Sequence, residues 1–248
     1  MATEFDPLAE RDVIAYVLGA LAAGRGGWMV NPNTDVLWQT AKQVGLRRLI
    51  QSADLVVADG MPLIWASRVR GEPLPERVAG ATLIRSMSFA AARAGVPVFL
   101  LGGNEGVAER AATRLMTECP ALVAGHHCPP LGFESDAAQR ASIDEEVRRF
   151  GPAIYYCGLG FPKQERLMAE LAERFPASWF IGSGASLSFV AGETRRAPLW
   201  MQTAGLEWCF RLWEEPGRLF RRYIVHDLPF AARMLATSLL ARLRRWRR

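Results

Sequence analysis

The chain has 248 residues, half of them hydrophobic, which suffices for a buried core and excludes an intrinsically disordered protein. Its longest apolar runs fall short of the roughly 18 residues that a membrane-spanning helix needs. The acidic N-terminus predicts no signal peptide. Cys119, Cys128, Cys157 and Cys209 form no CxxC pair, which argues against a zinc site or a disulfide framework and favours a reducing cytosol.

The net charge of +5 is unevenly distributed along the chain. Residues 1–204 are almost neutral, whereas residues 205–248 carry ten arginines and only four acidic side chains. Codon bias in a GC-rich genome explains the general preference for arginine over lysine, but not this clustering. Because a guanidinium can bind a phosphate through two hydrogen bonds, the clustering favours an anionic partner.

Short apolar runs alternate with stretches of helical period between residues 28 and 182. The expected strands are Trp28–Val30, Leu55–Ala58, Val98–Leu101, Ala121–Ala124, Ile154–Cys157 and Trp179–Ile181. The expected helices are Val36–Leu49, Val107–Glu118, Ile143–Phe150 and Gln164–Phe175. Such alternation predicts an α/β fold with a mostly parallel, Rossmann-like sheet and helices on both faces.

The pattern changes after Gly192, where helices are expected over Trp200–Trp213, Pro216–Val225 and Leu228–Trp246. We therefore expect an α/β catalytic domain over residues 1–197 and a helical, arginine-rich appendage over residues 198–248. The last helix has an apolar face and a basic end. This pattern fits a helix lying in a membrane interface, and it fits equally an amphipathic helix docked on the core.

Ligands of parallel α/β sheets bind beyond the carboxyl ends of the strands, so polar residues at those points are candidates. Asp59 follows the second expected strand in Ala58-Asp59-Gly60. A carboxylate there can act as a general base. The alternative is that Asp59 caps a helix that begins near Pro62.

Two glycine-rich turns follow later strands. Gly102-Gly103 opens a helix and could let backbone amides approach an anion, although a plain turn is as good an explanation. The octet from Gly158 to Glu165 is more informative, because glycines and a proline precede three polar side chains in the first helical turn. This octet indicates a nucleotide or sugar site that includes Gly160, Lys163, Gln164 and Glu165.

The remaining candidates are Arg77 in a loop and Arg196 before a helix, for which surface ion pairs are the simpler explanation. His126 and His127 lack metal-ligand spacing and are expected at a strand end near the surface. The chain has no Asp-x-Asp motif to hold a divalent cation and no GxSxG serine motif, so we predict neither a metal site, nor a cofactor, nor a hydrolase triad.

The order of the motifs resembles that of the WecG/TagA/CpsF glycosyltransferases, glycosyltransferase family 26, over about residues 12–225. The resemblance rests on the following motifs: Asn31-Pro-Asn33, Ala58-Asp59-Gly60, Glu76-Arg77-Val-Ala-Gly80, Phe99-Leu-Leu-Gly102-Gly103, the octet ending in Glu165, Ala191-Gly192, Arg196-Ala-Pro198, Gly205-Leu-Glu207-Trp208, Arg211, Glu215-Pro-x-Arg218 and Arg221-Arg222-Tyr223.

This resemblance implies an inverting bacterial enzyme that moves a sugar from a UDP-sugar to a saccharide linked to polyprenyl diphosphate, without a required metal. It implies that Asp59 is the catalytic base. Pocket positions are implied for Asn31, Asn33, Arg77 and Gln164, and phosphate contacts for Arg211, Arg218, Arg221 and Arg222. Ser188 stands where the family often has an aspartate, so it becomes a candidate determinant of the donor sugar.

A lipid-linked acceptor would give the basic C-terminal helix a purpose, namely peripheral binding to the anionic cytoplasmic face of the bacterial membrane. Three alternatives remain open from the residues themselves. They are a nucleotide-binding oxidoreductase, a nucleic-acid-binding protein that uses the arginine tail, and a non-catalytic membrane adaptor. The missing dinucleotide fingerprint and the neutral body of the chain count against the first two.

Overall fold

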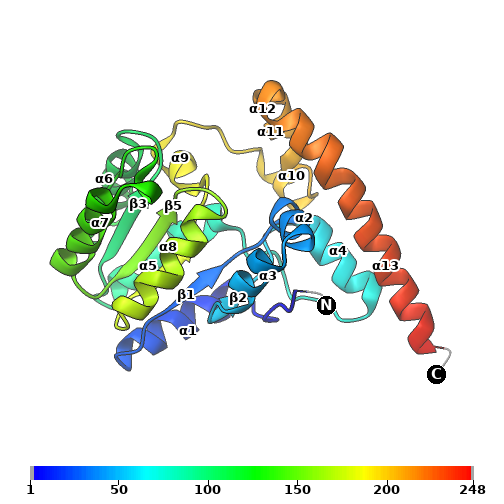
Figure 1. Ribbon diagram of the computed structural model, residues 1–248, viewed down its shortest axis with the longest axis horizontal. Coiled ribbons are helices and arrows are strands. Elements are labelled where there is room, and N and C mark those ends of the chain that lie inside the picture. Colours follow the sequence, from blue (N-terminus) through cyan, green and yellow to red (C-terminus); the bar gives the residue numbers. More distant parts are fainter. Residues whose placement is uncertain (1–2, 247–248) are drawn as a thin grey trace.

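A single six-stranded sheet forms the centre of the computed structural model, which describes residues 3–246 (Figure 1). Its strands are β1 (Gly27–Val30), β2 (Leu55–Val56), β3 (Val98–Gly102), β4 (Ala124–His127), β5 (Ile154–Gly158) and β6 (Trp179–Gly182). Their order is β2-β1-β6-β5-β3-β4, and every pairing is parallel. The predicted α/β fold with a parallel sheet is therefore confirmed.

Successive residues of each central strand face opposite sides of the sheet and enter two different cores. Leu100 and Tyr156 belong to one core, whereas Leu101 and Tyr155 belong to the other. All four side chains are buried. Strands covered on both faces must be apolar at every position, which is why they appear in the sequence as continuous apolar runs.

Helices cover both faces of the sheet, as expected for parallel strands joined by crossover connections. The first core contains residues of α1 (Glu10–Ala22), α5 (Gly80–Arg93), α6 (Val107–Glu118) and α9 (Ser186–Ala191). The second contains residues of α2 (Thr34–Lys42), α3 (Val44–Gln51), α7 (Ala137–Phe150) and α8 (Lys163–Arg174), beside the short helix η1 (Phe133–Ser135).

The C-terminal segment, residues 198–246, is helical and lies to one side of the sheet (Figure 1). It comprises α10 (Leu199–Thr203), α11 (Glu207–Glu214), α12 (Pro216–Phe220), a π-helical turn η2 (Arg221–Asp227) and the long helix α13 (Leu228–Trp246). Helix α13 runs beside α4 (Met61–Arg70), where Phe230 and Met234 pack against a buried cluster that includes Leu63 and Ile64. The amphipathic helix is therefore docked on the body of the protein.

Docking leaves part of α13 uncovered. Leu239, Leu240 and Leu243 are each about half exposed. Within residues 3–246, no helix combines the length and apolar character required to cross a bilayer. Helix α13 thus has one face on α4 and an exposed apolar and arginine-rich remainder.

Several expected elements differ from the structure in their bounds by more than one residue. The helix expected over Ile143–Phe150 begins at Ala137, and the strand expected over Leu55–Ala58 ends at Val56. The helix expected over Val36–Leu49 is two helices, because Gln43 between them has an extended backbone. The strand expected at Ala121–Ala124 begins at Ala124, because a turn closed by a hydrogen bond from the Leu122 amide to the Cys119 carbonyl precedes it. His126 and His127 do end this edge strand near the surface, as predicted.

Two further differences lie in the C-terminal segment. The helix expected over Trp200–Trp213 is interrupted at Gly205, whose φ of +76° is left-handed and where a Cβ would lie 2.8 Å from Met61 and 2.9 Å from Trp65. The helix expected over Pro216–Val225 is α-helical only to Phe220 and then continues as the π-helical turn. The break at Gly205 depends on tertiary packing, which the spacing of apolar residues in the sequence does not reveal.

Candidate active site

A cavity of about 810 Å³ lies beyond the carboxyl ends of β1, β2, β5 and β6. Residues that follow these strands form one wall, and residues 205–235 of the C-terminal segment form the other. The volume falls within the roughly 300–1,000 Å³ typical of small-molecule sites. The position agrees with the general rule for parallel α/β sheets.

Asp59 lines this cavity from the loop after β2 and is partly buried. Its carboxylate accepts a hydrogen bond of 3.3 Å from the backbone N–H of Gly80, the first residue of α5. Helix α4, which begins at Met61 after Gly60, has no side-chain cap. The alternative that Asp59 caps the helix near Pro62 is therefore wrong.

The environment of Asp59 makes its carboxyl a stronger base than an exposed aspartate. Burial raises its pKa to about 6, and nearby Glu207 acts in the same direction. The guanidinium groups of Arg77 and Arg196 and the Gly80 N–H oppose this rise in pKa. A carboxyl of this kind is ionised at neutral pH yet can accept a proton readily, which suits a general base.

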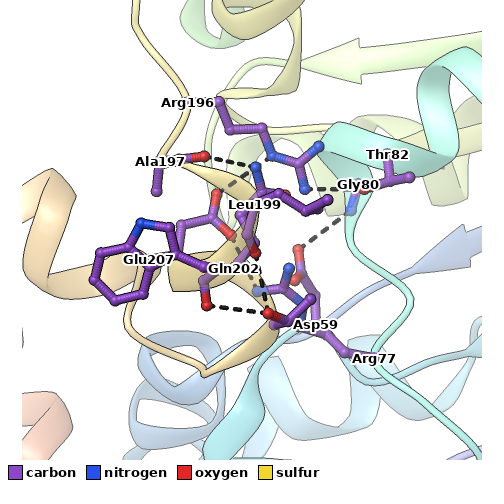
Figure 2. A network of polar contacts seen from close by, with 11 residues as sticks. Asp59, Arg77, Gly80, Thr82, Arg196, Ala197, Leu199, Gln202 and Glu207 are labelled. Atoms are coloured by element: carbon purple, nitrogen blue, oxygen red, sulfur yellow. Dashed lines mark hydrogen bonds and ion pairs between the residues drawn. The ribbon is translucent and has the colours of Figure 1, made fainter.

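The carboxylate of Glu207 forms ion pairs with two arginines beside Asp59 (Figure 2). Its Oε2 lies 3.1 Å from Nη1 of Arg77, and its Oε1 lies 3.5 Å from Nε of Arg196. Arg196 also donates a hydrogen bond of 2.9 Å to the hydroxyl of Thr82. Glu207 is the first residue of α11, so this network connects the C-terminal segment to the loops of the sheet.

Asn31 and Gln164 converge above the end of β6, where two glycines make room for them. A Cβ on Gly182 would lie 3.0 Å from Nε2 of Gln164 and 3.5 Å from Oδ1 of Asn31. A Cβ on Gly80 would lie 2.8 Å from Nδ2 of Asn31. Both amides line the cavity, where their donors and acceptors suit sugar hydroxyls or a nucleobase.

Asn33 has a second task besides lining the cavity. Its Oδ1 accepts a hydrogen bond of 3.1 Å from the Val36 N–H and so caps α2. An asparagine cap satisfies one of the free amides at a helix start.

Glu165 is a second cavity carboxyl with unusual surroundings. Its side chain accepts a hydrogen bond of 2.8 Å from the Gln164 amide, whose own oxygen accepts one from the Gly160 N–H at 3.2 Å. The residue is only 4% exposed, and Oε2 has no hydrogen-bond partner among the described residues. Burial raises its pKa to about 7, so a large fraction of Glu165 is protonated at neutral pH.

Three arginines of the C-terminal segment line the cavity, namely Arg211, Arg218 and Arg222. The guanidinium of Arg211 lies 5.5 Å from the ring centre of Phe189, and Arg218 pairs with Glu215 at 2.6 Å. Arg222 forms ion pairs with the carboxylates of Asp35 and Asp227. The exposed Arg221 belongs to the same turn but is not part of the cavity wall.

Five other candidate residues in the described part of the chain, residues 3–246, do not line the cavity. They are Gly102, Gly103, Lys163, Ser188 and Arg196. Gly102 and Gly103 have positive φ at the end of β3, where a Cβ on Gly102 would lie 2.7 Å from Leu159. Lys163 forms an ion pair with Glu134 on the surface.

Sequence reasoning assigned no role to Glu207, Asp35 or Asp227, all of which line the cavity. The sequence could have pointed to Glu207 and Asp227, because residues 205–248 contain only four acidic side chains among ten arginines. Acidic residues retained in such a basic segment are candidates for internal ion pairs. Among the described residues, no three His, Cys, Asp or Glu side chains gather in a way that could hold a metal ion.

The model of the Glycosyl transferase WecG/TagA/CpsF family matches residues 1–245. The chain therefore belongs to this family, as its motifs implied. The family is one of glycosyltransferases in cell-surface polysaccharide synthesis, so the reaction class is glycosyl transfer. Among the functions considered above, family membership favours this one over an oxidoreductase, a nucleic-acid-binding protein or an adaptor.

Proposed function

We propose that the protein transfers a sugar from a UDP-sugar to a saccharide linked to polyprenyl diphosphate, with inversion at C1 of the sugar. The product would enter teichoic acid, common antigen, capsule or exopolysaccharide. The observation that carries this proposal is the partly buried carboxyl of Asp59 in the cavity, whose pKa is raised to about 6 and which is flanked by arginines. This is the combination that a base acting beside a diphosphate needs.

In the proposed step, Asp59 accepts the proton of the acceptor hydroxyl as its oxygen attacks C1 of the donor sugar. The new bond joins that oxygen to C1 from the face opposite the diphosphate. The bond between C1 and the diphosphate oxygen breaks, and its electron pair leaves with UDP. One displacement of this kind inverts the configuration at C1, and the proton remains on Asp59.

Negative charge develops on the departing UDP and needs positive groups nearby. Arg211 and Arg218 line the cavity and are the first choice for this role. Arg221 and Arg222 lie on the adjoining π-helical turn and would contribute at longer range or to the diphosphate of the acceptor. Arg77 would orient the donor from the opposite wall.

The amide and carboxyl groups above the strand ends would bind the sugar and the uracil. Asn31, Asn33 and Gln164 offer both donors and acceptors there, and the unpaired oxygen of Glu165 adds one more site. Such groups discriminate among sugars strongly, because a ligand that leaves them unpaired in a partly dry site binds poorly.

The C-terminal segment would hold the enzyme at the cytoplasmic face of the membrane, where a polyprenyl-linked acceptor resides. Exposed apolar side chains occur along it, including Leu199, Trp200, Trp213 and Phe220. Basic residues near an anionic leaflet contribute about 1 kcal/mol each to binding. Together these features support peripheral association.

The direct test is a UDP-release assay across several UDP-sugars, with a short-chain polyprenyl-diphosphate saccharide as acceptor. We expect one donor to support turnover, and Asp59→Asn to lower kcat at least about 100-fold, since general base catalysis contributes about 10²–10⁴-fold. Parallel reactions with EDTA test whether a divalent metal takes part.

A matched control is Asp136→Asn, the same chemical change at an exposed residue that caps α7. Asparagine caps a helix nearly as well as aspartate, so this variant should keep its activity. Retention of most turnover by Asp59→Asn would remove Asp59 as the base. Failure of every UDP-sugar to release UDP in the presence of acceptor would contradict the proposed donor class.

A further inference from the structure

Four charged side chains of alternating sign meet beside the cavity, in the order Asp59, Arg77, Glu207 and Arg196 (Figure 2). Only Glu207 comes from the C-terminal segment. The other three belong to loops next to the sheet, before residue 198. The contacts of Glu207 therefore exist only when the C-terminal segment is docked on the sheet.

The two guanidinium groups face Glu207 rather than Asp59. Arg77 and Arg196 lie 3.1 Å and 3.5 Å from the Glu207 carboxylate, and neither forms an ion pair with Asp59. The carboxylate of Asp59 instead accepts the Gly80 N–H at 3.3 Å. Asp59 is thus left without a cationic partner although two cations are close enough to lower its pKa.

Loss of the Glu207 charge would change this arrangement. The side chains of Arg77 and Arg196 are 16% and 23% exposed, so they are poorly solvated and need an anionic partner. With Glu207 neutral, Asp59 would be the nearby carboxylate available to them. A carboxylate held in an ion pair gives up its negative charge reluctantly and is a weaker base.

We propose that Glu207 is a positioning residue for Asp59: by occupying Arg77 and Arg196, it keeps both guanidiniums off the Asp59 carboxylate. The docked C-terminal segment thereby activates the base as well as closing the cavity. This inference rests on the proposed function, in which Asp59 takes the acceptor proton. It assigns a specific part of that function to the first residue of α11.

A purely mechanical role for Glu207, as an anchor of α11, would leave the proton affinity of Asp59 unchanged. A direct effect of the Glu207 charge alone would change it in Glu207→Gln but not in Glu207→Asp, which keeps the charge. The measurement that separates the two roles is the titration of Asp59 itself. The carboxyl ¹³C signals of aspartate-labelled full-length protein are followed by NMR against pH, and the Asp59 signal is the one missing from Asp59→Asn. This readout needs neither donor, acceptor nor turnover.

We expect Glu207→Gln to lower the pKa of Asp59 by about one unit or more, because an opposite charge nearby shifts a carboxyl by about 1–3 units. Glu207→Asp, which keeps the charge but has a shorter reach, should lower it in the same direction by less. The matched control is Glu215→Gln, which breaks the neighbouring pair with Arg218 and should leave the Asp59 titration unchanged.

The acidic limb of the pH profile of kcat/KM should move to lower pH in Glu207→Gln by the same amount as the NMR titration. An unchanged Asp59 titration in both Glu207 variants overturns the inference. An Asp59→Asn variant that keeps its turnover instead overturns the proposed function and leaves the titration result intact, so the two failures are distinguishable. Should Glu207→Gln not fold, the titration of Glu207→Asp decides alone.

Discussion

The guanidinium of Arg222 lies 3.3 Å from the carboxylate of Asp35, which joins the π-helical turn of the C-terminal segment to the first turn of α2. Its Nε lies 3.8 Å from the carboxylate of Asp227. Burial raises the pKa of Asp227 to about 7, with Arg222 opposing the rise and Asp35 adding to it. Arg222 is thus already paired, and it anchors the wall of the cavity.

Arg222→Gln should therefore lower the free energy of unfolding more than Arg221→Gln, the same change at the exposed neighbouring position. The substitution leaves two poorly solvated carboxylates without a cation, and we expect a loss of about 2 kcal/mol at pH 8. The loss should shrink at pH 5, where Asp227 can be neutral. Urea unfolding of Arg222→Gln and Arg221→Gln at both pH values checks this, and equal midpoints for the two variants would contradict it.

The rate of sugar transfer should fall with acidity around pH 6. Asp59 must be ionised to accept a proton, and its pKa is raised to about 6. At pH values below this, kcat/KM should drop about tenfold per pH unit, while above it the rate should level off. A profile measured with saturating acceptor is sufficient. An acidic limb centred near pH 4 would show that the titrating group is an unperturbed carboxyl.

Glu165 should make stability depend on pH. Its pKa is 4.5 as an ordinary glutamate and about 7 in the fold, so the folded chain binds more protons than the unfolded chain between these values. Stability is then fully present below about pH 4.5 and declines as the pH rises through 7.

The isosteric variant Glu165→Gln cannot lose a proton and should escape this decline. Its stability relative to wild type should rise by about 3 kcal/mol from pH 4.5 to pH 8. Glu173→Gln, at an exposed position of the same helix, should change stability by less than about 0.5 kcal/mol at either pH. A pH-independent difference for Glu165→Gln would mean that Glu165 is ionised throughout.

Gly205→Ala should disturb the junction of α10 and α11. The residue has a φ of +76°, and a Cβ there would lie 2.8 Å from Met61 and 2.9 Å from Trp65. We expect a loss of about 2 kcal/mol or more from the combined backbone and steric strain. Gly217→Ala, in α12 with open space around it, should be neutral or slightly stabilising. Thermal unfolding compares the two.

Membrane binding should depend on the uncovered side of α13. Replacing Leu239, Leu240 and Leu243 together by Gln removes three half-exposed apolar side chains and keeps Phe230 and Met234, which pack against the cluster that includes α4 residues, so sedimentation with anionic vesicles should fall at least about tenfold. Leu131→Gln makes the same change at a fully exposed leucine outside α13, and this variant should sediment like wild type. Binding should also weaken at high salt. Undiminished sedimentation of the triple variant would argue against this surface.

Elements whose pattern is set by local periodicity were predictable. Helix Val107–Glu118 has the expected bounds, and the strand expected over Ile154–Cys157 is only one residue longer, because continuous burial or a single buried face determines their composition. The break at Gly205 was not predictable in this way. It depends on contact with Met61 and Trp65, which are about 140 residues earlier in the chain.

The residues of the candidate site also fall into those that local sequence features predicted and those that only tertiary structure reveals. Asp59, Asn31 and Gln164 follow strands, so the rule that parallel strands place their carboxyl ends together was enough to find them. Glu207 acts through Arg77, which is 130 residues away in sequence. No spacing rule connects such a pair, and only the docked position of the C-terminal segment brings it together.

The outer wall of the cavity is formed by residues 205–235, after the last strand of the sheet has ended at Gly182. A growing chain can therefore complete its central sheet while the enclosure for the sugar nucleotide is still missing. An unfinished or clipped product would hold Asp59 at an open rim, with water free to reach it. Such a product lacks the arginines of the outer wall and should be inert toward both substrates.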